Sequence, residues 1–500
     1  MDTTAMRARG MTIKSPTSSV EAGCRGRAHL SNTLDDPLLF LPARFATARR
    51  DTENVSAYDC RRPDAPEARS ARLGRAGAPG YGFNPPSHEH RRGRDRQPHQ
   101  LREGAVIDGV TDRERGNSVL ILFSDTGGGH RAAAKALEQA LTQLDPQVKI
   151  AKLDPLMGAD SSPGLVRRLV GLYSPIIQRS PPIWGALYHG FNNRPAFAAV
   201  RGVFGGRIRR IIGVALKEFD PDLVLSVHPL LNHVSWQAIR RSGRERGLVT
   251  VVTDLVEFHL GWMFPRSDLT VVPTDSARQE CLAAGLAEDK VQLLGLPVDL
   301  RFRPPAPGEK AALRRRFGID QNRFTILVSG GGEGSGKLLT QVRALARRGG
   351  DWQLIVVCGR NEKLHRRLAR VDFQSRARIL GFVDNMPDLM RAADLVVSKA
   401  GPGAIGEALA TEVPILLTSY LPGQETPNVT FVTESGLGLY TPKPEQLLAA
   451  VQELSLPGSE RWRSMAERAA EISRPYASLD IARECLRVAG RYRAAGQASR

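Results

Sequence analysis

A histidine directly follows three glycines at a point where an apolar strand gives way to a helix. Val119 to Phe123 form a continuous apolar run, and Ala132 to Leu141 reads as a helix, so the glycines up to Gly129 occupy the turn between them. In open α/β sheets this turn lies at the carboxyl ends of the strands, where ligands bind and where glycines let the backbone approach them. His130 would project from the first helical turn, where an imidazole can take up a proton.

A second glycine cluster, Ser329 to Lys337, resembles a phosphate-binding loop but lacks one of its functional groups. The stretch Gly331 to Lys337 fits G-x-x-x-x-G-K, yet Leu338 stands where Ser or Thr must hold magnesium. We therefore expect no NTP hydrolysis. Clustered backbone N–H groups ahead of a helix still attract a diphosphate without a metal, which suits a nucleoside diphosphate as a leaving group.

A third cluster, Ser398 to Ala408, again places glycines and a proline between a strand and a helix. Glu407 falls in the first turns of that helix, where a carboxylate could accept both hydroxyls of a ribose. The alternative is that it only complements the helix dipole. Downstream, Leu421 to Asn428 is a turn rich in hydrogen-bonding side chains, which suits the hydroxyls of a sugar but is also common in surface turns.

Apolar runs of strand length alternate with helical stretches in two successive sets, which predicts two parallel sheets. The expected strands of the first set are Val119 to Phe123, Val148 to Leu153, Leu223 to Val227, Leu248 to Val252, Leu269 to Val272 and Val291 to Leu294. Those of the second set are Phe324 to Val328, Gln353 to Cys358, Arg378 to Leu380, Leu395 to Val397 and Ile415 to Leu417. We predict an α/β chain with two Rossmann-like domains that face each other across a cleft.

The charge balance favours an anionic partner. The 500 residues contain 70 Lys+Arg and 52 Asp+Glu, a net charge of +18, and such a surplus attracts polyanions. Basic residues between Arg167 and Lys217 are interleaved with aromatic ones, including Tyr173, Trp184 and Tyr188. This mixture is typical of a surface that rests on anionic lipid. The alternative is a solvated basic helix face.

The remaining features limit the class of protein. No apolar run reaches the roughly 20 residues of a membrane-spanning helix, and the amino terminus lacks the apolar core of a signal peptide, so we expect a cytoplasmic protein. The five cysteines show no CxxC spacing, and we expect free thiols and no structural metal. Residues 1–116 lack periodicity and are expected to be disordered. Asp220-Pro221-Asp222 precedes a predicted strand and is interpreted as a turn, not as a metal-binding DxD motif.

Seven motifs, taken in the order in which they occur along the chain, resemble those of the monogalactosyldiacylglycerol synthases and related diacylglycerol glucosyltransferases. This family belongs with the undecaprenyl-linked N-acetylglucosamine transferase among inverting GT-B glycosyltransferases. The resemblance covers roughly residues 117–475. It rests on SDTGGGH, Pro182-x-Trp184 with Tyr188, Thr253-Asp254 with His259 and Trp262, GLPV from Gly295, SGGGEGSG, SKAGPG and PGQE-x-x-N.

The resemblance implies a division of labour. Residues 1–116 form the extension, 117–303 an acceptor and membrane-binding domain, 304–475 a UDP-sugar domain and 476–500 a helical tail that packs back across the junction. His130 would deprotonate the acceptor, with Asp254 or His259 as supporting groups. Tyr173, Trp184, Tyr188 and Trp262 would lie on the acceptor and membrane side. The alternative for His259 and Trp262 is that they only fix a loop under the acceptor site.

The same resemblance implies the donor contacts. Phe382 and Val383 would flank the uracil, and Glu407 would hold the ribose. The backbone around the diphosphate and the groups on the hexose would come from Gly128, Gly129, Ser329, Gly331, Gly332, Gly401, Gly403, Ala404, Gln424, Glu425 and Asn428.

The implied reaction transfers a hexose from a UDP-sugar to diacylglycerol with inversion. We favour galactose over glucose. The UDP-sugar is a substrate, and no cofactor or metal is expected. The partners would be diacylglycerol and an anionic membrane, with peripheral association at its cytoplasmic face and no nucleic acid. One alternative is a related transferase for another lipid acceptor, such as a polyprenyl-diphosphate sugar. A second is a basic, non-enzymatic binder of nucleic acid or membrane.

Overall fold

The computed structural model describes most of the chain after residue 115. The described residues are 116–124, 128–156, 190, 193–257, 259–331, 338–347, 350–371, 373 and 376–498. The predicted extension up to residue 115, the glycine of the first cluster before Gly128, the aromatic residues Tyr173, Trp184 and Tyr188, and Gly332 lie outside these ranges.

The first domain is built on a six-stranded parallel sheet with the order β2-β1-β3-β4-β5-β6. All six predicted strands are confirmed, and no strand end differs from its predicted position by more than one residue. Their bounds are β1 Ser118–Leu122, β2 Lys149–Leu153, β3 Leu223–Ser226, β4 Gly247–Val251, β5 Leu269–Val272 and β6 Val291–Leu293.

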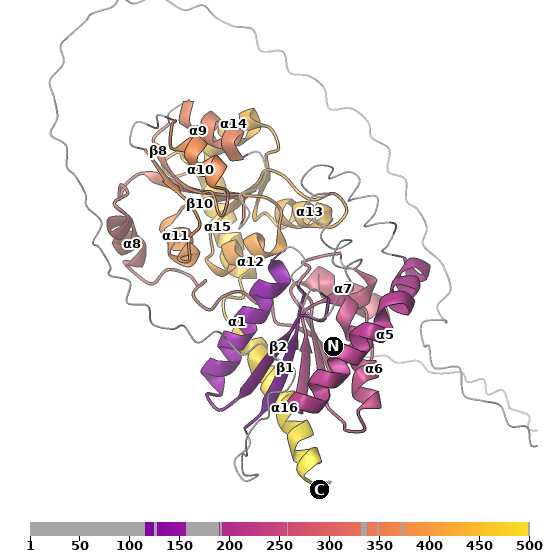
Figure 1. Cartoon of the computed structure of the whole chain (residues 1–500). Helices are drawn as coiled ribbons and strands as arrows, with labels where there is room; N and C mark the ends of the chain where they lie inside the picture. The colour runs from indigo at the N-terminus through magenta and orange to yellow at the C-terminus, as the bar shows by residue number, and fades with distance from the viewer. Residues whose placement is uncertain are drawn as a thin grey trace, which may run out of the picture. The chain divides into compact units, whose positions relative to one another are not determined.

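Helices cover both faces of this sheet (Figure 1). They are α1 Gly129–Leu144, α5 Arg194–Phe219, α6 Asn232–Arg241, α7 Asp275–Ala283 and, from the end of the chain, α16 Ala477–Ala498. The strand β1 is buried along its whole length because its side chains alternate between two cores. Val119 and Ile121 pack in the cluster that contains Ile481 of α16, and Leu120 and Leu122 pack in the cluster of α5 and α6.

The second domain repeats the plan with a parallel sheet of order β12-β11-β10-β7-β8-β9. Its strands are β7 Phe324–Ser329, β8 Trp352–Val357, β9 Ala377–Leu380, β10 Leu395–Ser398, β11 Ile415–Leu417 and β12 Gly438–Tyr440. Its helices are α8 Glu309–Phe317, α9 Leu338–Arg347, α10 Glu362–Leu368, α11 Met386–Ala392, α12 Pro402–Ala410, α13 Thr426–Glu434, α14 Pro444–Leu454 and α15 Glu460–Ile472. The prediction of two Rossmann-like sheets is confirmed.

The sequence analysis did not predict the edge strand β12. It is only three residues long and begins with a glycine, so it carries no apolar run that would indicate a strand. It pairs with β11 in parallel register, Ile415 beside Gly438. A Cβ atom at Gly438 would lie 1.8 Å from the carbonyl oxygen of Ile415. The close approach of the two backbones therefore requires glycine at this position.

The last helix returns to the first domain. α16 packs against α1, β3 and β4, and a Cβ at Gly247 would lie 2.7 Å from a methyl group of Val488. The segment from Gly295 passes the start of this helix, where the Ser478 hydroxyl donates to the carbonyl of Val298 at 2.6 Å. This hydrogen bond fixes the linker between the domains to the start of α16.

Replacing Gly438 tests the close approach of β11 and β12. We expect G438A to lower the free energy of unfolding by roughly 1–3 kcal/mol, the usual cost of overpacking, because a backbone oxygen must give way. The urea midpoint followed by circular dichroism measures the loss. G490A in α16, where no atom lies within 4 Å of the new Cβ, is the matched control and should not lower the midpoint. Equal midpoints for both variants would contradict the close approach.

Candidate functional site

His130 lies at the start of α1, at the carboxyl end of the first sheet. Gly128 precedes the helix with φ of 84°, a left-handed conformation that glycine adopts without strain, and this turn aims the first helical residues at the strand ends. The Nδ1 atom of His130 lies 2.9 Å from the hydroxyl of Thr253, which follows β4. The ring also forms a hydrogen bond with the backbone of Val227, which follows β3. Three strand ends therefore fix one imidazole.

Burial keeps this imidazole neutral. It lowers the pKa of His130 to about 4, although the hydrogen bond to Val227 acts in the opposite direction. A ring that is uncharged at neutral pH has a lone pair available to accept a proton. The lowered pKa makes this ring a weak base, so a proton transfer to it would have to be coupled to a step that consumes the deprotonated acceptor.

A second histidine, which the sequence analysis missed, packs against the first. The ring of His228 lies edge-on to His130 with the centroids 4.7 Å apart, and it is only 5% exposed. Burial, followed by the charges of His130 and His259, lowers the pKa of His228 well below its ordinary value. His228 directly follows the strand run that ends at Val227, and this position at a strand end is the signal that could have identified it.

His228 and His259 play the same local role at the starts of two short 3-10 helices. Nδ1 of His228 accepts from the N–H of Leu230 at 3.3 Å, and Nδ1 of His259 accepts from the N–H of Gly261 at 3.0 Å. Burial also lowers the pKa of His259 to about 4. Phe197 of α5 lies edge-on to the His259 ring, with the centroids 5.0 Å apart.

Asp254 and Trp262 form a buried pair beside these rings. The indole Nε1 of Trp262 donates to Oδ2 of Asp254 at 2.8 Å. Burial raises the pKa of Asp254 to about 6, although the bond from Trp262 lowers it. Trp262 has no exposed surface, and its ring centroid lies 6.3 Å from that of His130. The expected role of Trp262 on the acceptor and membrane side stays a prediction. The alternative, that it fixes a loop, describes its position.

On the second domain, Glu407 lies in α12, whose first position is Pro402. Burial, followed by the negative charge of Asp299, raises the pKa of Glu407 to about 8. The first N–H groups of α12, around Gly403 and Ala404, have no partner within the helix. A Cβ at Gly403 would meet no atom within 4 Å, which leaves the helix start open to a ligand.

Two of the residues predicted to contact the hexose, Glu425 and Asn428, bind other groups of the second domain. Nζ of Lys399 lies 2.6 Å from Oε1 of Glu425, and the second Glu425 oxygen accepts from the N–H of Leu421 at 2.8 Å. The amide of Asn428 donates to the carbonyl of Ala400 at 2.9 Å. These bonds tie the loop before α12 to the turn before α13. They fix the side chains of Glu425 and Asn428, whose contacts with the hexose stay predictions.

Gln424 differs from its two neighbours because its side chain has an unused acceptor. Its Oε1 atom is buried and has no hydrogen-bond partner among the described residues. A buried acceptor without a partner carries a free-energy penalty that a ligand hydroxyl would remove.

The other predicted donor contacts lie at the ends of β7 and β9. The Ser329 hydroxyl accepts from the N–H of Gly331 at 3.2 Å, and Gly331 has φ of 73°. Phe382 is 60% exposed, and the Arg360 guanidinium lies 4.8 Å from its ring centroid. Sequence analysis did not single out Arg360. Val383 packs against the core of the second domain.

Buried contacts connect the two halves of the site. Leu255, next to Asp254, belongs to the same apolar cluster as Ile405 of α12. The carboxylate of Asp299 in the linker interacts electrostatically with Lys135 of α1 and with Glu407 of α12. The helix of His130 and the helix of Glu407 therefore share one charged neighbour.

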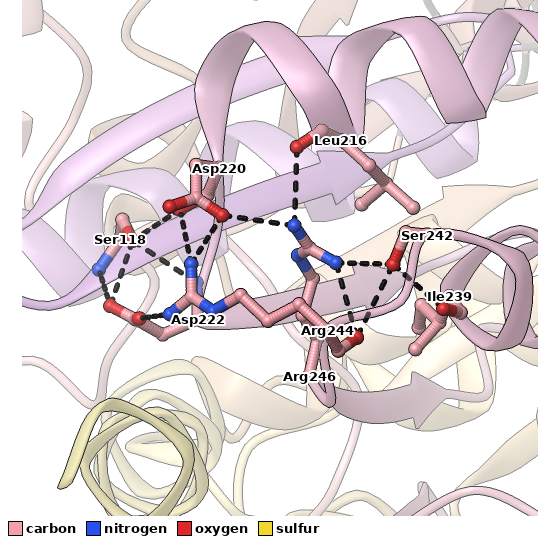
Figure 2. A network of polar contacts seen from close by, with 8 residues as sticks. All are labelled: Ser118, Leu216, Asp220, Asp222, Ile239, Ser242, Arg244 and Arg246. Atoms are coloured by element: carbon pink, nitrogen blue, oxygen red, sulfur yellow. Dashed lines mark hydrogen bonds and ion pairs between the residues drawn. The ribbon is translucent and has the colours of Figure 1, made fainter. Parts of the chain in front are cut away.

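The predicted turn Asp220-Pro221-Asp222 precedes β3, and arginines form ion pairs with both of its carboxylates. Figure 2 shows Arg244 between Asp220 and Asp222, with Arg246 also on Asp220. Asp222 in addition accepts from the hydroxyl of Ser118 at 2.8 Å. In the part of the chain that the structure describes, no three His, Cys, Asp or Glu side chains are arranged to hold a metal ion.

The lowered histidine pKa values predict a loss of stability in mild acid. The folded protein binds these protons less readily than the unfolded chain, so the contribution is complete above pH 6.5 and is lost as the pH falls toward 4. We expect the urea midpoint of H259Q to fall less over this range than that of the unchanged protein. H365Q, in α10, is the matched control and should follow the unchanged protein. If H259Q also follows it, the buried neutral state of His259 is disproved.

Comparison with known proteins assigns each domain to a family. Residues 130–298 match the monogalactosyldiacylglycerol (MGDG) synthase family, and residues 325–477 match the C-terminal domain of glycosyltransferase family 28. Among solved structures, MurG of Acinetobacter baumannii is 16% identical, with a TM-score of 0.49, and the match covers 74% of this chain and 99% of that one.

Curated relatives match over both domains. A probable chloroplastic monogalactosyldiacylglycerol synthase of Glycine max is 35% identical over 391 residues, which cover 76% of this chain and 72% of the relative. Monogalactosyldiacylglycerol synthase 1 of Arabidopsis thaliana is 34% identical over 392 residues, with the same coverage. The chain therefore belongs to the monogalactosyldiacylglycerol synthase family of GT-B glycosyltransferases.

Proposed function

We propose that this chain transfers galactose from UDP-galactose to 1,2-diacylglycerol and forms monogalactosyldiacylglycerol. Its relatives are named for that product. The observation that carries the assignment to this chain is the neutral, strand-fixed imidazole of His130 within the segment that matches the synthase family. The test is incubation of the protein with labelled UDP-galactose or UDP-glucose and diacylglycerol vesicles. A labelled lipid from UDP-galactose supports the proposal, and no labelled lipid from either donor contradicts it.

The reaction is a single displacement. His130 removes the proton from the acceptor hydroxyl, whose oxygen then forms a bond to the anomeric carbon. The bond between that carbon and the diphosphate oxygen breaks, and UDP leaves with the electron pair. Attack from the face opposite the leaving group inverts the anomeric centre. Asp254 and His228 support this step by fixing the surroundings of His130.

The diphosphate would lie at the start of α12, near the loop that follows β7. Backbone N–H groups at Gly401, Gly403 and Ala404 would stabilise the negative charge that develops on the leaving UDP, as would those near Gly331. Gly128 and Gly129 would approach the sugar from the first domain. We propose that this arrangement replaces a divalent metal in neutralising the leaving group.

The rest of the donor has matching groups. Glu407 would accept the ribose hydroxyls, and donor binding would favour its ionised form. Phe382 would lie against the uracil ring, with Val383 beside it. The unused acceptor of Gln424 suits a hydroxyl of the hexose, in a turn that Glu425 and Asn428 hold in place.

The acceptor is insoluble in water, so the protein must reach a membrane surface. No helix in the described part of the chain is both long and apolar enough to cross a membrane. The helix α5 combines exposed apolar side chains, Val203 at 73% and Val214 at 51%, with the exposed cations Arg207, Arg210 and Lys217. This combination supports peripheral association with an anionic membrane face.

Removing the imidazole of His130 should abolish transfer. We expect H130A to lower kcat by about 10²–10⁴, the usual contribution of a general base, with little change in the KM for UDP-galactose. In the unchanged protein, kcat/KM at pH 5.5 should stay above half its value at pH 7, since the pKa of His130 is lowered to about 4. An ordinary imidazole would keep only about a tenth of its basic form there. A rate that falls tenfold by pH 5.5, with the fold intact by circular dichroism, would contradict a buried base.

Replacing Glu407 should weaken donor binding and spare the chemical step. We expect E407A to raise the KM for UDP-galactose about tenfold, the effect of one lost charge-assisted contact, with kcat changed less than threefold. E412A, in the turn directly after α12 and outside the proposed site, is the matched control. EDTA should leave both parameters unchanged if no metal takes part. A loss of kcat at unchanged KM would assign Glu407 to the chemistry and not to the ribose.

A further inference from the structure

A concave site lies in the first domain between the carboxyl-terminal parts of α5 and α6. Its volume is about 660 Å³, and it is partly open to solvent. Five cationic side chains line it, namely Arg209, Arg210, Lys217, Arg241 and Arg246. Two glycines of α5, Gly206 and Gly213, add no side-chain bulk to its wall.

The only carboxylate in the lining is Asp220, and two arginines already hold it. Arg244 and Arg246 both bind its Oδ1 atom (Figure 2). Burial raises the pKa of Asp220, but the bonds from the two arginines outweigh burial and lower it below its ordinary value. Asp220 therefore has little capacity left to neutralise the cations on the opposite wall of the cavity.

Two of the remaining cations, Arg209 and Arg241, repel one another. Burial and then the charge of Arg241 lower the pKa of Arg209, which shows that the two guanidinium groups lie within electrostatic reach. The NH1 atom of Arg209 donates to Oε1 of Gln237 at 2.8 Å, a neutral acceptor that leaves its charge uncompensated. A bound anion would relieve this repulsion.

The cavity lies at the other end of the sheet from His130. Asp220 and Arg246 stand directly before β3 and β4, at the amino ends of these parallel strands. Val227 and Thr253, which hold His130, follow the same two strands. The depth of the sheet therefore separates the cavity from the glycine turns of the catalytic end.

We propose that this cavity binds the phosphate group of an anion other than the reacting donor. Guanidinium groups on two helices present several N–H donors in planar pairs, the geometry that phosphate oxygens accept. The source of the phosphate is either a small soluble phosphate or the headgroup of an anionic lipid. The inference does not depend on the transferase activity, because it rests on groups outside the proposed catalytic site.

The experiment compares phosphate binding by the full chain and by a double variant of the cavity. R209Q/R241Q removes two cations of the lining, neither of which is among the α5 cations proposed to face a membrane. R366Q/R367Q, on exposed positions of α10 in the second domain, removes the same charge and is the matched control. Binding of inorganic phosphate is measured by isothermal titration calorimetry with UDP present to fill the proposed donor site.

The lipid source is tested by flotation with vesicles of phosphatidylcholine alone and of phosphatidylcholine mixed with phosphatidylserine. We expect R209Q/R241Q to weaken binding about tenfold or more in at least one arm, and R366Q/R367Q to leave it within about twofold of the unchanged protein. Loss in the calorimetric arm indicates a soluble phosphate, and loss only with the mixed vesicles indicates a lipid headgroup. Equal binding by both variants in both arms would overturn the proposal.

Discussion

The burial of one uncharged imidazole is the constraint on which the catalytic end of this protein depends. His130 is fixed by Thr253, by the backbone of Val227 and by the ring of His228. The removal of water keeps it neutral and also makes its protonation costly. A site built in this way favours a proton transfer that occurs together with attack on the donor over one that precedes it.

Apolar packing and electrostatic interactions connect the second domain to the linker and to the helix that begins beside His130. The linker after Gly295 is fixed because a Cβ at Gly406 would lie 2.6 Å from a methyl group of Leu296. It places Asp299 within reach of both Lys135 and Glu407. Burial, followed by the negative charge of Asp299, raises the pKa of Glu407. Ribose hydroxyls and the uridine nucleotide would change that balance, so donor binding and the ionisation of Glu407 are linked.

The two ends of the first sheet have different electrostatic character. The carboxyl ends carry neutral histidines and a carboxyl group with a raised pKa, which suits the handling of a proton. The amino ends carry arginines. Arg244 forms ion pairs with Asp220 and Asp222, and Asp222 also accepts a hydrogen bond from Ser118. The helix α5 contacts both regions, since Phe197 packs on His259 and Arg209 lines the cationic cavity. Some of the excess cationic side chains of the sequence therefore line this cavity.

The sequence by itself determined the two parallel sheets and the glycine turns at their strand ends, because strand periodicity and turn chemistry are local. It also singled out His130 and Glu407, whose roles in the reaction stay predictions. Tertiary structure decided the rest. His130 and Thr253 stand 123 positions apart, and no local pattern predicts that contact. The pairing of β12, the burial of Trp262, the packing of His228 and the cationic cavity likewise arise where distant segments meet. Solvent exclusion and proximity between charges exist only once the chain has folded, and these two effects shift the pKa values of His130, Asp254 and Glu407.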